Sequence, residues 1–199
     1  MDTETRDGPP RALLIAAIVV AVGAIVTILV VVALRQRPVP EQPVAIVTIP
    51  APQADSAQCL ELVEALPERL DDYRRATVAE PAPSGAAAWR ATPDGEPVVL
   101  RCGVERPAEF VLGSPLQVVD AVSWFRVGEE GAGETGVGEA GAGETGADDD
   151  GRSTWFAVDR PVYVALTLPP GSGPTPIQEI SRVIANLLPA KDVDPAPVR

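Results

Sequence analysis

Residues 97–104 read Pro-Val-Val-Leu-Arg-Cys-Gly-Val. This stretch predicts a central strand that carries one of the two cysteines of a disulfide. The turn signal Pro-Asp-Gly at 93–95 favours a hairpin that joins it to a second strand at 86–91. Alternate side chains of a strand share a face, and the face that we expect to meet the core carries Val98, Leu100, Cys102 and Val104. Cys102 is therefore expected to be buried.

The other cysteine lies in a predicted helix, which is capped by Asp55 or Ser56 and ends where Pro67 interferes. The apolar face of this helix repeats at i, i+3, i+4 and i+7 through Cys59, Leu62, Val63 and Leu66. Cys59 and Cys102 thus point inward from adjacent elements, which predicts a disulfide between them. Such a bridge would stabilise the fold by about 4 kcal/mol on the chain-entropy estimate. Two buried free thiols are the alternative.

Residues 12–34 form an uncharged apolar run. As a helix the run would be about 34 Å long, enough to cross a hydrocarbon core of about 30 Å. It is longer than the apolar core of a cleaved signal peptide, so it predicts an uncleaved signal anchor that makes the chain a single-pass protein of the cell membrane. Two arginines on each side leave the positive-inside rule tied. The predicted disulfide breaks the tie, because it needs an oxidising compartment, and we expect residues 1–11 in the cytoplasm and the rest outside it.

The remaining chain predicts one domain at 55–190, behind a proline-rich linker at 35–54 whose residues 44–49 favour a first short strand. Further strands are predicted at 118–127, 153–158 and 162–168, of which the first two form a hairpin. The resulting fold class is α+β, a mainly antiparallel sheet with two helices packed on one face.

The second of these helices is expected to begin at Thr175 as its cap, with Pro176 in first position and Gln178 as capping-box partner. Pro189 ends it, and the inward face predicted for it carries Ile177, Ile180, Ile184 and Leu187. The proline-rich tail at 191–199 is expected to be disordered.

Residues 128–151 separate the two arms of the predicted hairpin and consist mainly of a ten-residue Gly/Glu tandem repeat. They carry eight acidic residues and no Lys or Arg, within a chain whose net charge is −12. The insertion has too little apolar surface to offset the entropy of ordering, so we predict a disordered hairpin tip. An acidic chain without a basic run also excludes nucleic acid as a partner.

Histidine is absent from the sequence, which excludes His-based catalytic triads and the usual zinc, copper and non-haem iron sites. Asp148, Asp149 and Asp150 lack the spacing of a calcium loop, and the only lysine lies in the tail. Only carboxylate pairs remain for catalysis, namely Asp71 with Asp72 and Glu105 with Glu109. We therefore predict no catalytic residue, no metal site and no cofactor.

Large aromatic and cationic side chains of the predicted sheet could form a surface that binds a ligand or partner. The candidates are Trp89, Arg101, Arg106, Trp124 and Arg160. Core packing is the alternative for the two tryptophans, as it is for Trp155, and the arginines would be either an anion-binding groove or solvated strand charges.

Five short motifs occur in this order over residues 56–188. They are Cys59 with Leu62, Leu66 and Pro67; Ala87-Ala88-Trp89; Leu100-Arg101-Cys102-Gly103-Val104 with Pro107; Val122-Ser123-Trp124; and Val158-Asp159-Arg160. This pattern resembles the membrane-anchored or secreted actinobacterial proteins classed as Domain of Unknown Function 3515, although Arg90 stands where that family usually has Gly. The resemblance implies an extracytoplasmic domain with paired cysteines and no assigned activity.

We expect a non-catalytic module of the cell envelope, held to the lipid bilayer by residues 12–34, that binds a protein, cell-wall or lipid-linked partner. Two alternatives stay open. One is an envelope enzyme that works through carboxylates. The other is a structural subunit of a membrane complex, in which the apolar helix pairs through Gly23 and alanines.

Overall fold

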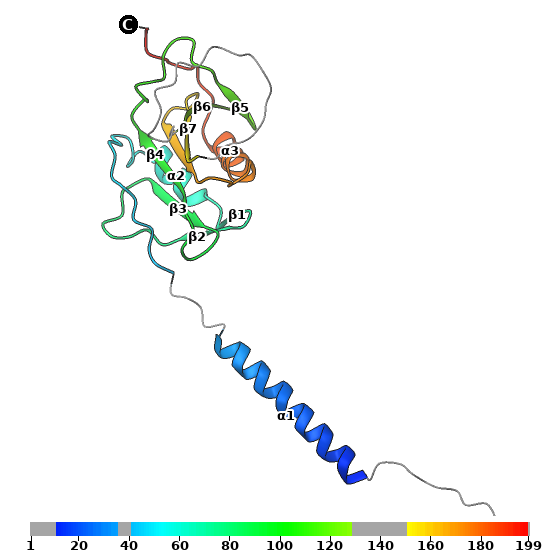
Figure 1. The fold of residues 1–199 in the computed structure, drawn as a ribbon. Helices are drawn as coiled ribbons and strands as arrows, with labels where there is room; N and C mark the ends of the chain where they lie inside the picture. Colours follow the sequence, from blue (N-terminus) through cyan, green and yellow to red (C-terminus); the bar gives the residue numbers. More distant parts are fainter. Residues whose placement is uncertain (1–10, 36–40, 129–150, 199) are drawn as a thin grey trace, which may run out of the picture. The chain divides into compact units, whose positions relative to one another are not determined.

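A computed structural model describes residues 11–35, 41–128 and 151–198, and the chain divides into two units, Met1–Pro40 and Glu41–Arg199 (Figure 1). The first unit contains helix α1, Arg11–Arg35. Its stretch Leu14–Val32 is long and apolar enough to cross a membrane, and none of it is buried. The hydroxyl of Thr27 donates to the carbonyl of Gly23 at 2.8 Å, so this polar group is satisfied within the helix.

The second unit is built on one eight-stranded antiparallel sheet with the strand order β1-β2-β3-β4-β8-β7-β6-β5 (Figure 1). The strands are β1 Arg69–Leu70, β2 Tyr73–Ala76, β3 Ala86–Arg90, β4 Val98–Val104, β5 Gln117–Val119, β6 Val122–Gly128, β7 Ser153–Ala157 and β8 Tyr163–Leu168. Two four-stranded meanders thus meet where β4 pairs with β8. These central strands are largely buried on both faces, with Arg101 of β4 and Tyr163 and Thr167 of β8 only partly buried.

Helices α2, Ala57–Ala65, and α3, Thr175–Leu187, contact each other and pack on the same face of the sheet, which confirms the predicted α+β fold (Figure 1). The main core lies between them and the sheet and includes Leu62, Trp89, Leu100, Trp124, Leu166, Ile180 and Ile184. Ser56 is the cap of α2, and its hydroxyl accepts from the backbone N–H of Cys59. The predicted face of α2 is correct, with Val63 only half-buried.

A smaller apolar cluster lies on the other side of the sheet, which we call the outer face. Phe110 in the connection from β4 to β5 packs on Phe125 of β6, with ring centroids 5.3 Å apart. The β4–β5 connection therefore covers part of the outer face as it runs toward the edge strand β5.

Two strand predictions are wrong in detail. The predicted strand 118–127 is split into β5 and β6 by a turn at Asp120 and Ala121, whose φ angles are 44° and 63°. Asp120 suits the first position of this left-handed turn, but Ala121 follows it where Gly is usual, so the signal in the sequence is weak. The expected strand at 44–49 is reduced to a single parallel bridge between Val44 and Val78.

The last helix differs from the prediction at both ends. Pro174 occupies the cap position, no side chain caps the helix, and Thr175 is already helical. Leu187 is 39% exposed, whereas Leu188 turns inward and is 2% exposed. The helix ends at that point, so the 3.6-residue pattern no longer sets the direction of the side chain.

The tail follows a defined path through residue 198, in contrast to the disorder expected from its composition. Ala196 bridges Val111 in parallel and exchanges backbone hydrogen bonds with Phe110 and Leu112. Most of the predicted disordered repeat, residues 129–150, lies outside the described residues.

Candidate functional site

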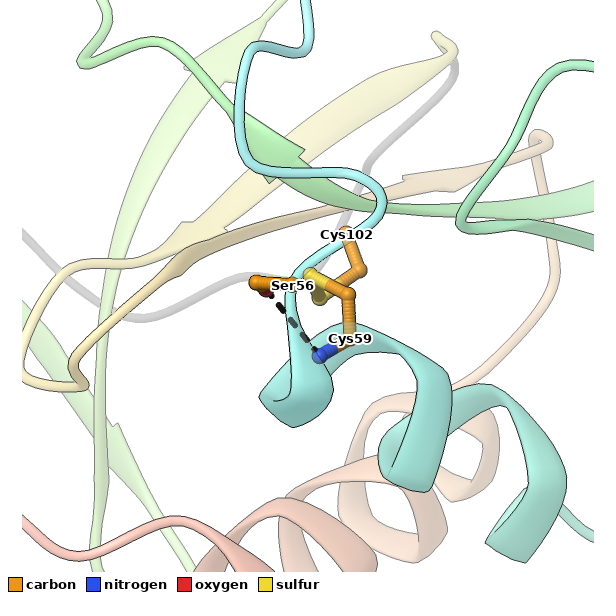
Figure 2. The surroundings of a disulfide bond; sticks show 3 residues. All are labelled: Ser56, Cys59 and Cys102. Atoms are coloured by element: carbon orange, nitrogen blue, oxygen red, sulfur yellow. Dashed lines mark hydrogen bonds between the residues drawn. A yellow bond between two sulfur atoms is a disulfide. The ribbon is translucent and has the colours of Figure 1, made fainter.

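The disulfide between Cys59 and Cys102 is present, with a Cα–Cα distance of 5.5 Å and both residues fully buried (Figure 2). Figure 2 shows the first turn of α2 held under β4 by this bond, beside the hydrogen bond from Cys59 to the hydroxyl of Ser56. The bridge joins the helix layer to the central strand, as its position on two inward faces predicts.

The glycine after Cys102 allows the chain to cross the end of β4. Gly103 has φ +79°, and a Cβ on it would lie 2.3 Å from the backbone of Gln53 and Ala54. The N–H of Gln53 donates to the carbonyl of Gly103 at 3.1 Å, so the approach of the two segments is hydrogen-bonded. Ala54 at this crossing lies three residues before Ala57, the first residue of α2, which is itself two residues before Cys59.

Both tryptophans proposed as ligand contacts are fully buried. The indole N–H of Trp89 donates to the carbonyl of Pro67, and that of Trp124 donates to the hydroxyl of Ser181. The distances are 2.8 Å and 2.9 Å. A buried indole needs such an acceptor, so each ring is a packing residue that is also held in one orientation.

Arg160 is also structural. Only 2% exposed, it pairs with Asp159 at 2.9 Å and donates to the carbonyl of Ala121 at 2.6 Å. Asp159 in turn accepts from the backbone N–H of Ser123 at 2.9 Å. The pair thereby fixes the turn between β5 and β6, a role that the Val-Asp-Arg motif did not reveal because its partners lie 36 and 39 residues away.

The other two arginine candidates differ from Arg160 and from each other. Arg106 is exposed and pairs with Asp194 of the tail at 3.4 Å. Arg101 points from β4 to the outer face, where it is half-buried, and its pKa is lowered by burial and then by the nearby charge of Arg152. The structure therefore does not assemble the three arginines into the single anion-binding groove considered from the sequence.

An open groove of about 360 Å³ lies over the outer face. Its lining is mostly apolar and comes from the linker, from the segment after β4, and from β6 and β7; it includes Ile49, Pro50, Val104, Pro107, Val127 and Phe156. Glu105 and Glu109, one of the two carboxylate pairs considered above, also line it, and both are exposed. The sequence alone does not indicate this groove, because its walls come from segments far apart in the chain.

No group of three metal-ligating side chains occurs within the described residues. The acidic triplet at 148–150 lies outside them, so the structure does not test the expectation that it forms no calcium loop.

These features define a class: an α+β domain with one internal disulfide, in a chain whose N-terminal region forms an apolar helix of the kind found in membrane anchors and signal peptides. The chain belongs to the family described as Protein of unknown function (DUF3515), whose model matches residues 18–193. The match covers most of the apolar helix as well as the domain. No curated protein matches the chain. Nor does any solved structure.

Proposed function

We propose that α1 anchors this protein in the cell membrane and that its disulfide-stapled domain works outside the cytoplasm. The supporting observations are an uncharged helix, exposed throughout Leu14–Val32, and a fully buried disulfide in the domain. Exposed apolar surface of this extent is stable only in lipid or against a partner. Disulfides persist in oxidising compartments, which favours an extracytoplasmic domain.

Protease protection in intact cells tests this topology. Protease added from outside should degrade the domain and leave a fragment of about the size of residues 1–40. Loss of only the first ten or so residues would mean the reverse orientation. Release of the whole domain into the medium without protease would mean that the helix is cleaved as a signal peptide.

We further propose that the domain is a binding module that acts through the outer-face groove. The observation that carries this proposal is the combination of an apolar floor with two exposed carboxylates at Glu105 and Glu109. This chemistry suits an apolar envelope segment that bears Lys or Arg, because the carboxylates would pair with the cation while the floor takes the apolar part. An open, solvated groove is also more typical of a partner surface than of a site that must exclude water.

Site-specific photocrosslinking in intact cells tests the groove. A photoreactive residue at Ile49, which is 38% exposed in the groove, should capture a partner. The same residue at Leu60, 57% exposed on α2, is the matched control on the helix side of the sheet and should capture less. Glu105→Gln with Glu109→Gln should lower capture at Ile49. Equal capture at both positions, insensitive to the two glutamates, would contradict the proposal.

A hydrolytic enzyme is the second candidate, and it is favoured by one observation, the presence of Glu105 and Glu109 in the same groove. Two carboxylates that flank a bound substrate are the minimum for general acid–base hydrolysis. If this is the function, Glu105→Gln and Glu109→Gln should each abolish turnover of envelope glycans while leaving binding intact. Loss of binding without any measurable wild-type turnover would favour the binding module.

A further inference from the structure

The guanidinium of Arg101 has no polar partner among the described residues. Its Nε is buried without a hydrogen bond, and no described side chain forms an ion pair with it. A guanidinium stays charged in proteins and carries five donors. Burying part of such a group without an acceptor is unfavourable, so its presence at this position calls for an explanation.

Two other arginines of this domain differ from Arg101 in that their outer guanidinium nitrogens have polar partners. Arg90 and Arg160 also have a buried Nε without a partner, but their outer nitrogens are hydrogen-bonded. Arg90 donates to the carbonyls of Gln42 and Pro93, and Arg160 is paired as described above. Arg101 has no counterpart to these contacts in the part of the chain that is described, although it is half-buried in the same sheet.

Arg101 lies near another cation, which affects its pKa. Burial lowers its pKa, and the nearby cation Arg152 lowers it further. Arg152 itself pairs with Glu96 at 3.1 Å, so that carboxylate is already engaged. An anion beside Arg101 would relieve both unfavourable contributions, since it would replace lost hydration and offset the repulsion.

Hydroxyl donors lie close to Arg101 on the same face. Arg101 pairs with Ala165 of β8, and Thr167, two residues further along β8, pairs with Thr154 of β7. A diagonal neighbour at this spacing is within reach of a long side chain. The two threonine hydroxyls lie 3.1 Å apart, so one proton is used between them and the other is free to donate outward.

We infer that Arg101 is the centre of an anion site for a phosphate-class group, with the Thr154–Thr167 hydroxyls and Arg152 as neighbours. The planar fork of a guanidinium binds two oxygens of a phosphate in parallel, and an adjacent hydroxyl donor and second cation complete a common arrangement for such anions. Arg101 itself does not line the outer-face groove proposed above, whereas its neighbour Thr154 does, so the anion site adjoins that groove.

The test uses the full chain in nanodiscs of zwitterionic phosphatidylcholine, titrated with inorganic phosphate at constant ionic strength. The Nε–H resonance of Arg101 should shift and saturate. Arg101→Gln should weaken binding, followed by protection against thermal unfolding, at least about tenfold, and Arg101→Lys should fall between. Arg74→Gln removes an exposed strand arginine elsewhere and should leave binding unchanged.

Stability without phosphate separates a ligand site from a structural one. Because Arg101 makes no polar contact with described residues, Arg101→Gln should not destabilise the phosphate-free protein, whereas loss of a structural arginine would. A saturable shift with dissolved phosphate supports a soluble ligand, and a shift only in nanodiscs that contain phosphatidylglycerol supports a lipid headgroup. A linear response shared by Arg101→Gln would overturn the inference. Binding that appears only after Asp148, Asp149 and Asp150 become Asn would overturn it as well, since the chain would then supply its own anion.

Discussion

Replacing Gly103 by Ala should destabilise the domain more than the same change at any open glycine of similar backbone conformation. The added Cβ would lie 2.3 Å from the backbone N of Ala54 and the carbonyl carbon of Gln53. Backbone atoms cannot rotate aside as a side chain can, so the linker must move away from β4. That movement shifts the start of α2, to which Cys102 is bonded through Cys59.

The expected loss of unfolding free energy in Gly103→Ala has two parts. A positive φ costs an alanine about 1–2 kcal/mol, and steric overpacking typically adds about 1–3 kcal/mol. Gly113 provides the matched control, because its φ is +89° and no atom lies within 4 Å of a Cβ there. We therefore expect Gly103→Ala to lower the free energy of unfolding by about 2–5 kcal/mol and Gly113→Ala by only about 1–2 kcal/mol.

Urea unfolding of the full chain in a non-ionic detergent measures both changes. All three tryptophans lie in the domain and none in residues 1–40, so tryptophan emission reports on the domain alone. The difference between the two variants isolates the steric part. Equal losses at Gly103 and Gly113 would show that the linker yields without resistance and would refute the role assigned to the crossing.

Three further predictions concern the disulfide and two buried polar contacts of the domain. Changing both Cys59 and Cys102 to Ala should lower the free energy of unfolding by about 4 kcal/mol, and a reductant should affect the wild type but not the variant in urea melts. Ser181→Ala should lower stability by about 1–3 kcal/mol, because the indole N–H of Trp124 then lacks its acceptor at 2.9 Å, and an unchanged urea midpoint would argue against the bond. Arg160→Met should lower stability by about 3–5 kcal/mol at neutral pH, since it leaves its buried partner carboxylate unpaired, and changing that carboxylate to Asn in the same chain should restore part of the loss.

Local patterns predicted the parts of this fold that depend on local physics. The helix α2 was found from its cap, its apolar repeat and Pro67, and the β3–β4 hairpin from its Pro-Asp-Gly turn. The disulfide followed because both cysteines lie on inward faces, and burial of an apolar face is a requirement that any compact fold must meet.

The errors fall where long-range contacts override local preference. Ala121 adopts a positive φ at a position where Gly is usual, and the guanidinium of Arg160 donates to its carbonyl there. The tail lacks the composition of an ordered segment, but its backbone finds partners beside Phe110, which neither local propensity nor apolar content can indicate.

The amino-acid sequence by itself determined the uncharged helix, the two inward-facing cysteines and the α+β class, because each depends on side chains a few positions apart. Only the tertiary structure decided that Trp89, Trp124 and Arg160 are internal, that Glu105 and Glu109 share a groove with Ile49, and that Arg101 is unpaired among the described residues. The physical reason is that burial and charge pairing depend on which distant segments meet. Which segments meet is set above all by the pairing of β4 with β8, whose partners lie 59 to 68 positions apart in the chain.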